Sequence, residues 1–121
     1  MSVTRLFPIL RSDDLAASIA FYERAFSAEV TYRFAPEGGD VVYVALAVGG
    51  GTIGIGFEPE VARGDAIALW IYTDDLEGEF AAAVQAGAEV VSQPQVMPWG
   101  ERVAELRDPD GNHLYLGLDS A

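Results

Sequence analysis

The stretch PWGERVAELRDPDGNHLYLG, residues 98–117, contains the side chains most able to do chemistry. Asp108 and Asp110 form an acidic loop, and His113 leads from this loop into an expected strand that also carries Tyr115. Carboxylate and imidazole groups are common metal ligands, and both also transfer protons. This combination is typical of a metal-dependent enzyme, so the first question is whether the segment holds a metal.

The composition limits the metal chemistry that one chain can support. The chain contains no cysteine, which excludes disulfides, thiolate catalysis and cysteine-ligated zinc or iron–sulfur sites. It contains a single histidine, so a site with several histidines cannot form within one chain. Whether the acidic loop binds a metal therefore depends on which other side chains the strands and helices bring close to it.

The charge of the chain also excludes one class of partner. The formal net charge is −12 at pH 7, and all seven basic residues are arginines. A phosphate backbone binds clustered cations, so nucleic acid is not expected as a partner. The acidity either keeps the protein soluble or attracts a cationic ligand.

The length and the apolar content predict one domain over residues 1–121. The chain has 121 residues, of which 50% are hydrophobic, enough to bury a core. It contains neither an apolar run long enough to cross a membrane nor the pattern of a signal peptide. We expect no membrane association and a cytoplasmic protein.

The two parts of the chain repeat each other. The motif SDDL, which ends at Leu15, matches TDDL, which ends at Leu76, at an offset of 61 residues. Later, GGTIGIGFE from Gly50 matches DGNHLYLGLD from Asp110 at an offset of 60 residues. A repeat of this extent predicts two similar modules, at about residues 1–60 and 61–121.

Each module carries one helix pattern and four strand patterns. Apolar residues at helical spacing predict helices that begin at Leu15 and Leu76, and the aspartates before them are expected to be helix caps rather than ligands. Alternating or β-branched runs predict strands at residues 5–11, 29–34, 41–48, 51–57, 67–72, 89–96, 102–107 and 113–118. The fold class is therefore α+β, with two tandem βαβββ modules.

A duplicated βαβββ unit with these motifs resembles the vicinal oxygen chelate superfamily, which includes glyoxalase I, ring-cleaving dioxygenases and bleomycin-resistance proteins. The strongest carriers of the resemblance are DDLAASIAFYERAF in the first module and RDPDGNHLYL in the second. The resemblance covers nearly the whole chain, and it implies a cupped mixed sheet around a cavity.

Metal-dependent members of this superfamily place one ligand, usually His or Glu, on each of four strands of the cup. These positions fall on Phe7, Ile55, Ala68 and Tyr115 in this sequence. The first three side chains cannot coordinate a metal, and a phenol is a poor ligand by itself. The resemblance therefore implies the scaffold without its metal site, and we expect no metal and no other cofactor.

Alternation along the strands indicates which side chains line the cavity. Within the last strand, His113 and Tyr115 share one face, while Leu114 and Leu116 share the face that packs on helices. The rings on the cavity face either bind a ligand or simply fill the cavity, and His113 is either a solvated neighbour of the turn or a hydrogen-bonding partner of the ligand. The residues expected to bind the ligand are Phe7, Ile9, Ile55, Ala68, Trp70, Tyr72, Trp99, Arg102, His113 and Tyr115.

Among the non-metal members, the bleomycin-resistance proteins are the most similar. They share the aromatic strand, here with Trp70 and Tyr72, and a PWG-R segment leading to LRDP-GN. The resemblance implies an acidic homodimer that traps an aromatic, cationic antibiotic or natural product in clefts built from both subunits. Acidic loop residues would attract the cation, and the candidates are Glu37, Asp40, Glu58 and Asp65.

Two other functions stay open. The first is a metal-independent lyase or isomerase, with proton transfer by Tyr115, His113, Glu105, Arg33 or Arg102. Against it, the sequence has no paired carboxylates and no histidine–carboxylate couple at a recognisable spacing. The second is a module that senses a small molecule or dimerises with another protein. On these grounds the sequence favours a binding protein over an enzyme.

Overall fold

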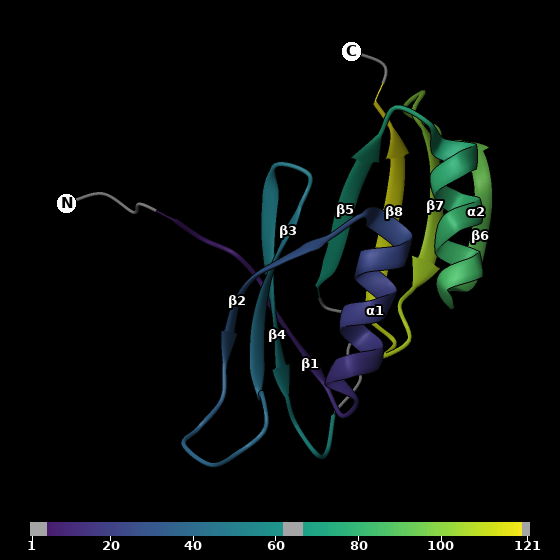
Figure 1. Ribbon diagram of the computed structural model, residues 1–121. Helices are drawn as coiled ribbons and strands as arrows, with labels where there is room; N and C mark the ends of the chain where they lie inside the picture. Colours follow the sequence, from purple (N-terminus) through teal and green to yellow (C-terminus); the bar gives the residue numbers. More distant parts are fainter. Residues whose placement is uncertain (1–4, 62–66, 120–121) are drawn as a thin grey trace.

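Two βαβββ modules make up the fold of the computed structural model, which describes residues 5–61 and 67–119 (Figure 1). In the first module the elements are β1 (Ile9–Ser12), α1 (Leu15–Phe26), β2 (Glu29–Phe34), β3 (Tyr43–Val48) and β4 (Gly51–Phe57). In the second module they are β5 (Ala68–Thr73), α2 (Leu76–Ala86), β6 (Glu89–Val96), β7 (Arg102–Arg107) and β8 (His113–Leu118). The predicted fold class and tandem modules are confirmed.

Each module forms its own four-stranded mixed sheet. The strand order is β1-β4-β3-β2 in the first sheet and β5-β8-β7-β6 in the second. The first and last strands of each module run parallel, whereas the other neighbours are antiparallel. Among the described residues no strand of one sheet pairs with a strand of the other, so β1 and β5 are edge strands.

The first strand is shorter than predicted. The sequence pattern predicts a strand at residues 5–11, but β1 begins at Ile9, which pairs with Gly54 of β4. Pro8 has no backbone N–H to donate, and its carbonyl only accepts a hydrogen bond from the Gly54 N–H at 2.9 Å. The pairing of β1 with β4 therefore begins after the proline.

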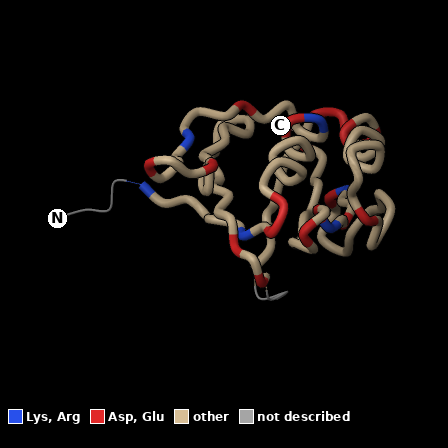
Figure 2. The backbone as a smooth tube through the Cα atoms, turned by 60° about the horizontal axis from the view of Figure 1, so that its bottom comes forward, with Lys and Arg blue, Asp and Glu red and all other residues tan. Residues whose placement is uncertain are grey.

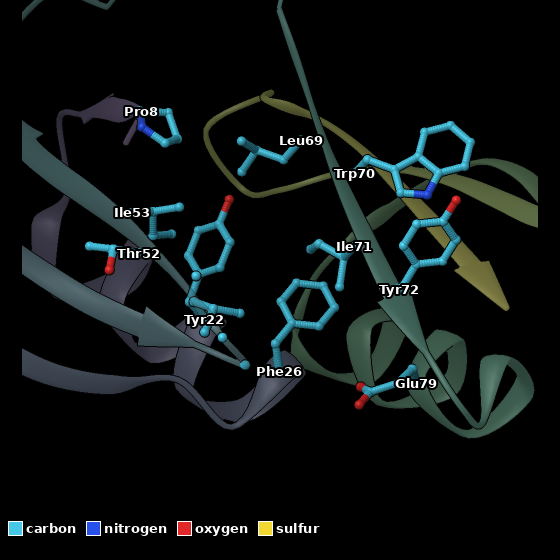
Figure 3. Close-up of a pocket in the computed structure, with 14 residues that line it drawn as sticks. Pro8, Tyr22, Phe26, Thr52, Ile53, Leu69, Trp70, Ile71, Tyr72 and Glu79 are labelled. Atoms are coloured by element: carbon cyan, nitrogen blue, oxygen red, sulfur yellow. The ribbon is translucent and has the colours of Figure 1, made fainter. Parts of the chain in front are cut away.

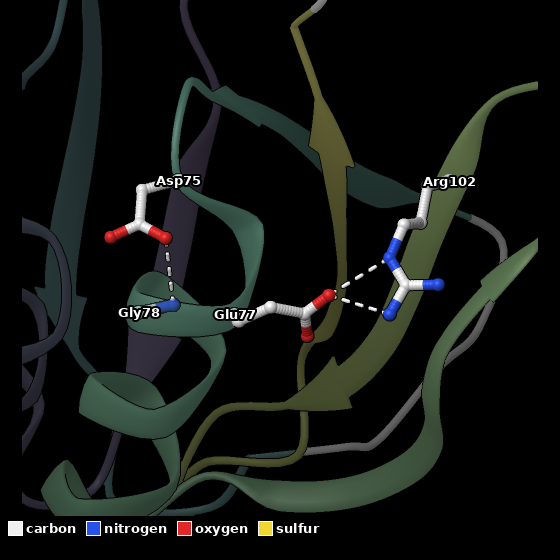
Figure 4. A network of polar contacts seen from close by, with 4 residues as sticks. All are labelled: Asp75, Glu77, Gly78 and Arg102. Carbon is white, nitrogen blue, oxygen red and sulfur yellow. Dashed lines mark hydrogen bonds and ion pairs between the residues drawn. The ribbon is translucent and has the colours of Figure 1, made fainter.

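Both helices begin at the aspartate caps that the sequence predicts. The Asp14 carboxylate accepts a hydrogen bond from the Ala17 N–H at 3.1 Å, and the Asp75 carboxylate accepts one from the Gly78 N–H at 3.1 Å (Figure 4). These bonds satisfy amide groups that have no partner within the helix. Asp14 and Asp75 are thus structural residues, as expected.

One hydrophobic core joins the two modules. Helices α1 and α2 pack against each other, and one face of each sheet contributes to the same core. The first sheet contributes Val44, Leu46, Ile53 and Ile55, and the second contributes Ala104, Leu106, Leu114 and Leu116. We call the opposite side of each sheet its open face. Because both helix-side faces belong to the core, both open faces lie outside it.

Acidic residues are distributed over both modules, with few basic residues between them (Figure 2).

In the described part of the chain, neither helix has the length and apolarity needed to cross a membrane.

Candidate ligand-binding site

The acidic loop between β7 and β8 is a structural junction. Asp108 is 3% exposed, and its Oδ2 accepts hydrogen bonds from the Tyr22 hydroxyl at 2.6 Å and from the Asn112 side-chain amide at 2.8 Å. Its Oδ1 accepts bonds from the backbone N–H groups of Asp110 and Asn112, at 3.0 and 2.8 Å. A carboxylate has about four acceptor positions, so this one is fully used by the protein.

The same loop connects the two modules. Besides the bond from Tyr22 of α1 to Asp108, the Ser12 hydroxyl at the end of β1 donates to Asp110 at 2.9 Å. Burial, together with the charge of Asp108, holds the pKa of Tyr22 well above its ordinary value, so the phenol stays protonated and donates. The aspartates that suggested a metal site therefore hold α1 and β1 against the second module.

A row of four rings crosses the open face of the second sheet. The Trp70 ring lies 5.9 Å from Tyr72 and stacks on Tyr115 at 5.2 Å, with an interplanar angle of 21°. Tyr115 in turn stacks on His113 at 5.2 Å and 30°. The parallel register of β5 and β8, in which Trp70 is opposite Tyr115, brings these rings together. We call Tyr72, Trp70, Tyr115 and His113 the aromatic row.

A glycine allows the aromatic row to lie close to the sheet. A Cβ atom added at Gly117 would lie 3.0 Å from the Trp70 Nε1 atom and 3.0 Å from the Tyr72 Cε1 atom. Contacts this short are tighter than normal packing allows, so a side chain at this position would displace the rings. The position of Trp70 and Tyr72 thus depends on Gly117.

We expect the Gly117→Ala variant to fold but to bind its ligand several-fold more weakly, because its methyl group would displace both rings by a few tenths of an ångström. Near-ultraviolet circular dichroism would detect the movement of the rings, and calorimetric titration would measure the affinity. Gly56→Ala is a matched control, since an added Cβ there meets only Tyr43 at 4.0 Å. Equal affinities of the two variants would show that the ring positions do not matter.

A histidine–carboxylate couple is present, contrary to the sequence analysis. The His113 Nε2 atom contacts the Glu105 carboxylate, and both side chains are largely buried. Glu105 of β7 pairs with Tyr115 of β8, so Glu105 and His113 are diagonal neighbours on one open face. Their separation of eight residues is not recognisable without the hairpin register, which explains why the sequence did not reveal it.

The turn between β6 and β7 adds two further residues to the site. The Glu101 carboxylate accepts one hydrogen bond from the Trp99 indole at 2.7 Å and another from the Tyr72 hydroxyl at 2.8 Å. The bond to Glu101 is also the main reason why the pKa of Tyr72 is raised. Trp99 was predicted from the sequence, but Glu101 was not. The only signal in the sequence was strand alternation, which places Glu101 on the same face as Glu105 because the two residues are four positions apart.

Two predicted site residues lie on the helix side of their sheets. Ile55 is 0% exposed and belongs to the hydrophobic core, so it does not reach the open face where the sequence analysis placed it. Arg102 forms two hydrogen bonds with Glu77 of α2, at 2.8 and 2.5 Å, and its guanidinium therefore points away from the aromatic row (Figure 4). Ile55 lies between Gly54 and Gly56, which have no side chains, so strand alternation did not indicate which face of the sheet Ile55 occupies.

The remaining predicted residues are divided between the two sheets. Ala68 is exposed at the start of β5, next to His113 in the register. Ile9 is exposed on the first sheet, and Phe7 is half-buried before it, with the Arg5 guanidinium 5.0 Å from its ring. Within one chain, Phe7 and Ile9 thus lie in the first module, whereas the aromatic row lies on the sheet of the second.

The acidic residues proposed to attract a cation have different environments. Glu37 and Asp40 are exposed in the connection between β2 and β3. The Glu58 carboxylate forms an ion pair with Arg11 at 2.8 Å, so its charge is partly compensated. Asp65 lies outside the described residues. The acids that contact the aromatic row are instead Glu101 and Glu105.

A cleft of about 430 Å³ lies beside the edge strand β5, and Trp70 and Tyr72 are among the residues that line it (Figure 3). Leu69 and Ile71 of β5 line it together with Tyr22 and Phe26 of α1. Glu79 of α2 also lines the cleft, and burial raises the pKa of its carboxyl group. The cleft is therefore mainly apolar and lies between the modules.

The donor set does not fit the metal site of the vicinal oxygen chelate fold. Three of the four corresponding positions hold Phe7, Ile55 and Ala68, which have no donor atoms in their side chains. In the part of the chain that the structure describes, no group of three or more His, Cys, Asp or Glu side chains is arranged to hold a metal ion. No chemical step is therefore assigned to a metal.

A family model described as the Glyoxalase/Bleomycin resistance protein/Dioxygenase superfamily matches residues 4–116. The chain belongs to this superfamily. The resemblance inferred from the sequence motifs is thereby confirmed.

The chain is also similar to an uncharacterized protein and to several solved structures. The chain is 31% identical to an uncharacterized protein of Mycobacterium bovis over 123 residues, which cover 93% of this chain and 81% of that protein. A glyoxalase/bleomycin resistance protein/dioxygenase family enzyme from Burkholderia phytofirmans PsJN has a TM-score of 0.78 and 19% identity, covering 93% of this chain and 95% of that one. A bleomycin-binding protein complexed with bleomycin has a TM-score of 0.71 and 24% identity, covering 98% and 100%. These solved structures share the fold.

Proposed function

We propose that this superfamily member is a metal-free binding protein of the bleomycin-resistance type, which sequesters an aromatic, cationic natural product without converting it. The observation that carries the proposal is the aromatic row on the open face of the second sheet. Trp70 and Tyr72 are exposed, so their ring faces are available for stacking with a flat ligand. A protein of the same fold has been solved as a bleomycin-binding protein complexed with bleomycin, which supports the proposal.

The charge of the protein supports a cationic ligand. The net charge of −12 attracts cations over a long range, which raises their local concentration and their rate of association. Two carboxylates, those of Glu101 and Glu105, contact members of the aromatic row. A ligand that stacks on the rings would therefore meet a carboxylate near each end of the row.

We further propose that the complete cleft forms between two copies of the chain. The open face of the first sheet carries large exposed side chains, namely Ile9, Tyr32 and Phe34, and exposed apolar surface of this kind is typical of an interface. The edge strands β1 and β5 are also available for contact with another chain. In a homodimer, the first sheet of one subunit would cover the aromatic row of its partner.

A fluorescence titration tests this function directly, because both tryptophans of the chain, Trp70 and Trp99, lie at the proposed site. EDTA-treated protein is titrated with a bleomycin-type glycopeptide and with a panel of cationic aromatic antibiotics, and each mixture is analysed for products. We expect saturable quenching at one ligand per subunit, with the ligand recovered unchanged and a dimer in sedimentation. The absence of quenching by every compound would contradict the proposal.

One observation favours a second candidate, a metal-independent isomerase or lyase. Glu105 contacts His113, and Tyr115 stacks on the same imidazole, so a proton acceptor and a phenol lie side by side. In that case the titration would yield product. His113→Gln would then abolish turnover while leaving ground-state binding largely unchanged. Recovery of unchanged ligand from the wild type would favour sequestration instead.

A further inference from the structure

Glu101 lies between two exposed aromatic side chains. Its Oε1 accepts a hydrogen bond from the Trp99 indole at 2.7 Å, and its Oε2 accepts one from the Tyr72 hydroxyl at 2.8 Å. Trp99 is 59% exposed and Tyr72 is 55% exposed, so the protein does not cover this arrangement. The carboxylate has about four acceptor positions, and two of them remain for a ligand.

Among the described residues no ion pair joins Glu101 to a basic side chain. The adjacent arginine, Arg102, points to the other side of the sheet, where it pairs with Glu77. The turn from Met97 to Glu101 is closed by a backbone hydrogen bond of 2.7 Å, which fixes the carboxylate next to the rings.

These surroundings match one type of cation better than others. Aromatic faces attract cations, and they favour alkylated ammonium groups because these have an apolar surface and a weakly hydrated charge. Trp70, at 5.9 Å from Tyr72, extends the aromatic surface from Glu101 toward the centre of the row. A ligand could therefore place an ammonium group at Glu101 and an aromatic ring over Trp70.

We propose that Glu101, together with the rings of Trp99 and Tyr72, forms the cation subsite of this protein and binds a tertiary or quaternary alkylammonium group of the ligand. This inference rests on the proposed binding function and names the chemical group that the site selects. Glu101 supplies the charge, while Trp99 and Tyr72 hold its carboxylate and surround the alkyl groups. The residue is thus a specificity determinant.

Two simple probes separate charge recognition from ring stacking. Benzyltrimethylammonium carries an aromatic ring and a quaternary ammonium group, whereas benzyl alcohol carries the ring without the charge. We expect wild-type protein to bind the cation at least about ten-fold more tightly in calorimetric titrations. Glu101→Gln should remove this preference without changing the affinity for benzyl alcohol. Its side-chain oxygen can still accept a hydrogen bond, and urea unfolding would verify its stability.

Glu23→Gln is the matched control, because it removes one acidic charge from an exposed position on α1, away from the open faces of the sheets. A preference retained in the control and lost in Glu101→Gln would support the cation subsite. Equal behaviour of the two variants, with both probes still bound, would overturn the subsite and leave the binding function intact. Failure of the wild type to bind either probe would overturn both proposals.

Discussion

The Asp108→Ala variant is expected to lose about 3 kcal/mol or more of its free energy of unfolding. The Asp108 carboxylate is buried and accepts hydrogen bonds from Tyr22, Asp110 and Asn112. Its removal would leave the buried Tyr22 hydroxyl and two half-buried backbone N–H groups without these partners, and each buried group left unpaired costs about 1 to 3 kcal/mol. Urea denaturation followed by circular dichroism would measure the loss.

Two comparisons make this prediction specific. Asp40→Ala removes an acidic residue from an exposed connection and should change the free energy of unfolding by no more than about 0.5 kcal/mol. Tyr22→Phe removes only the donor on α1 and should cost about 1 to 2 kcal/mol. A midpoint of Asp108→Ala close to that of Asp40→Ala would mean that the acidic loop does not hold the modules together.

The Trp70→Ala variant is expected to weaken ligand binding by about 30- to 100-fold, which corresponds to about 2 to 3 kcal/mol. Trp70 is the central member of the aromatic row, because its ring contacts both Tyr72 and Tyr115. Truncation would remove the largest stacking surface and leave the two tyrosines separated. Calorimetric titration with benzyltrimethylammonium is the appropriate measurement, since the variant has lost one of the two tryptophans that would report binding by fluorescence.

The control for this prediction is Val84→Ala, which shortens an exposed apolar side chain on α2, away from the open face. Its affinity should stay within about two-fold of the wild type. Unfolding midpoints of both variants would show whether the loss of affinity reflects the site or the stability of the fold. If Trp70→Ala binds as tightly as Val84→Ala, the aromatic row is structural and the ligand binds elsewhere.

Prediction from the sequence was most successful for local structure. The repeated DDL motifs located both helices and their caps, because capping depends on residues within one turn of each other. Strand alternation placed Trp70, Tyr72, His113 and Tyr115 on one face, and the burial of Leu114 and Leu116 on the other face agrees with it. Where alternation was weak, as in the Gly–Ile–Gly segment of β4, the face of Ile55 was assigned incorrectly.

The function of the acidic loop illustrates the limit of local patterns. The sequence showed Asp108 and Asp110 beside a histidine, which is also the pattern of a metal site. In the structure, the Asp108 carboxylate accepts a hydrogen bond from the hydroxyl of Tyr22 on α1, which is 86 residues away in the sequence. Only the packing of the two modules brings this donor to the carboxylate, so the distinction between a metal ligand and a structural residue was not available from the motif.

The sequence by itself determined the two modules, their helices and strands, the excluded classes of chemistry and the superfamily, because these follow from composition, periodicity and motifs. Tertiary structure alone decided which side chains meet across strands: Glu105 with His113, Glu101 with Tyr72, and Trp70 with Tyr115. The physical reason is that alternation fixes the face of a side chain within its own strand, whereas its neighbours depend on the register between strands, which is set by packing far along the chain.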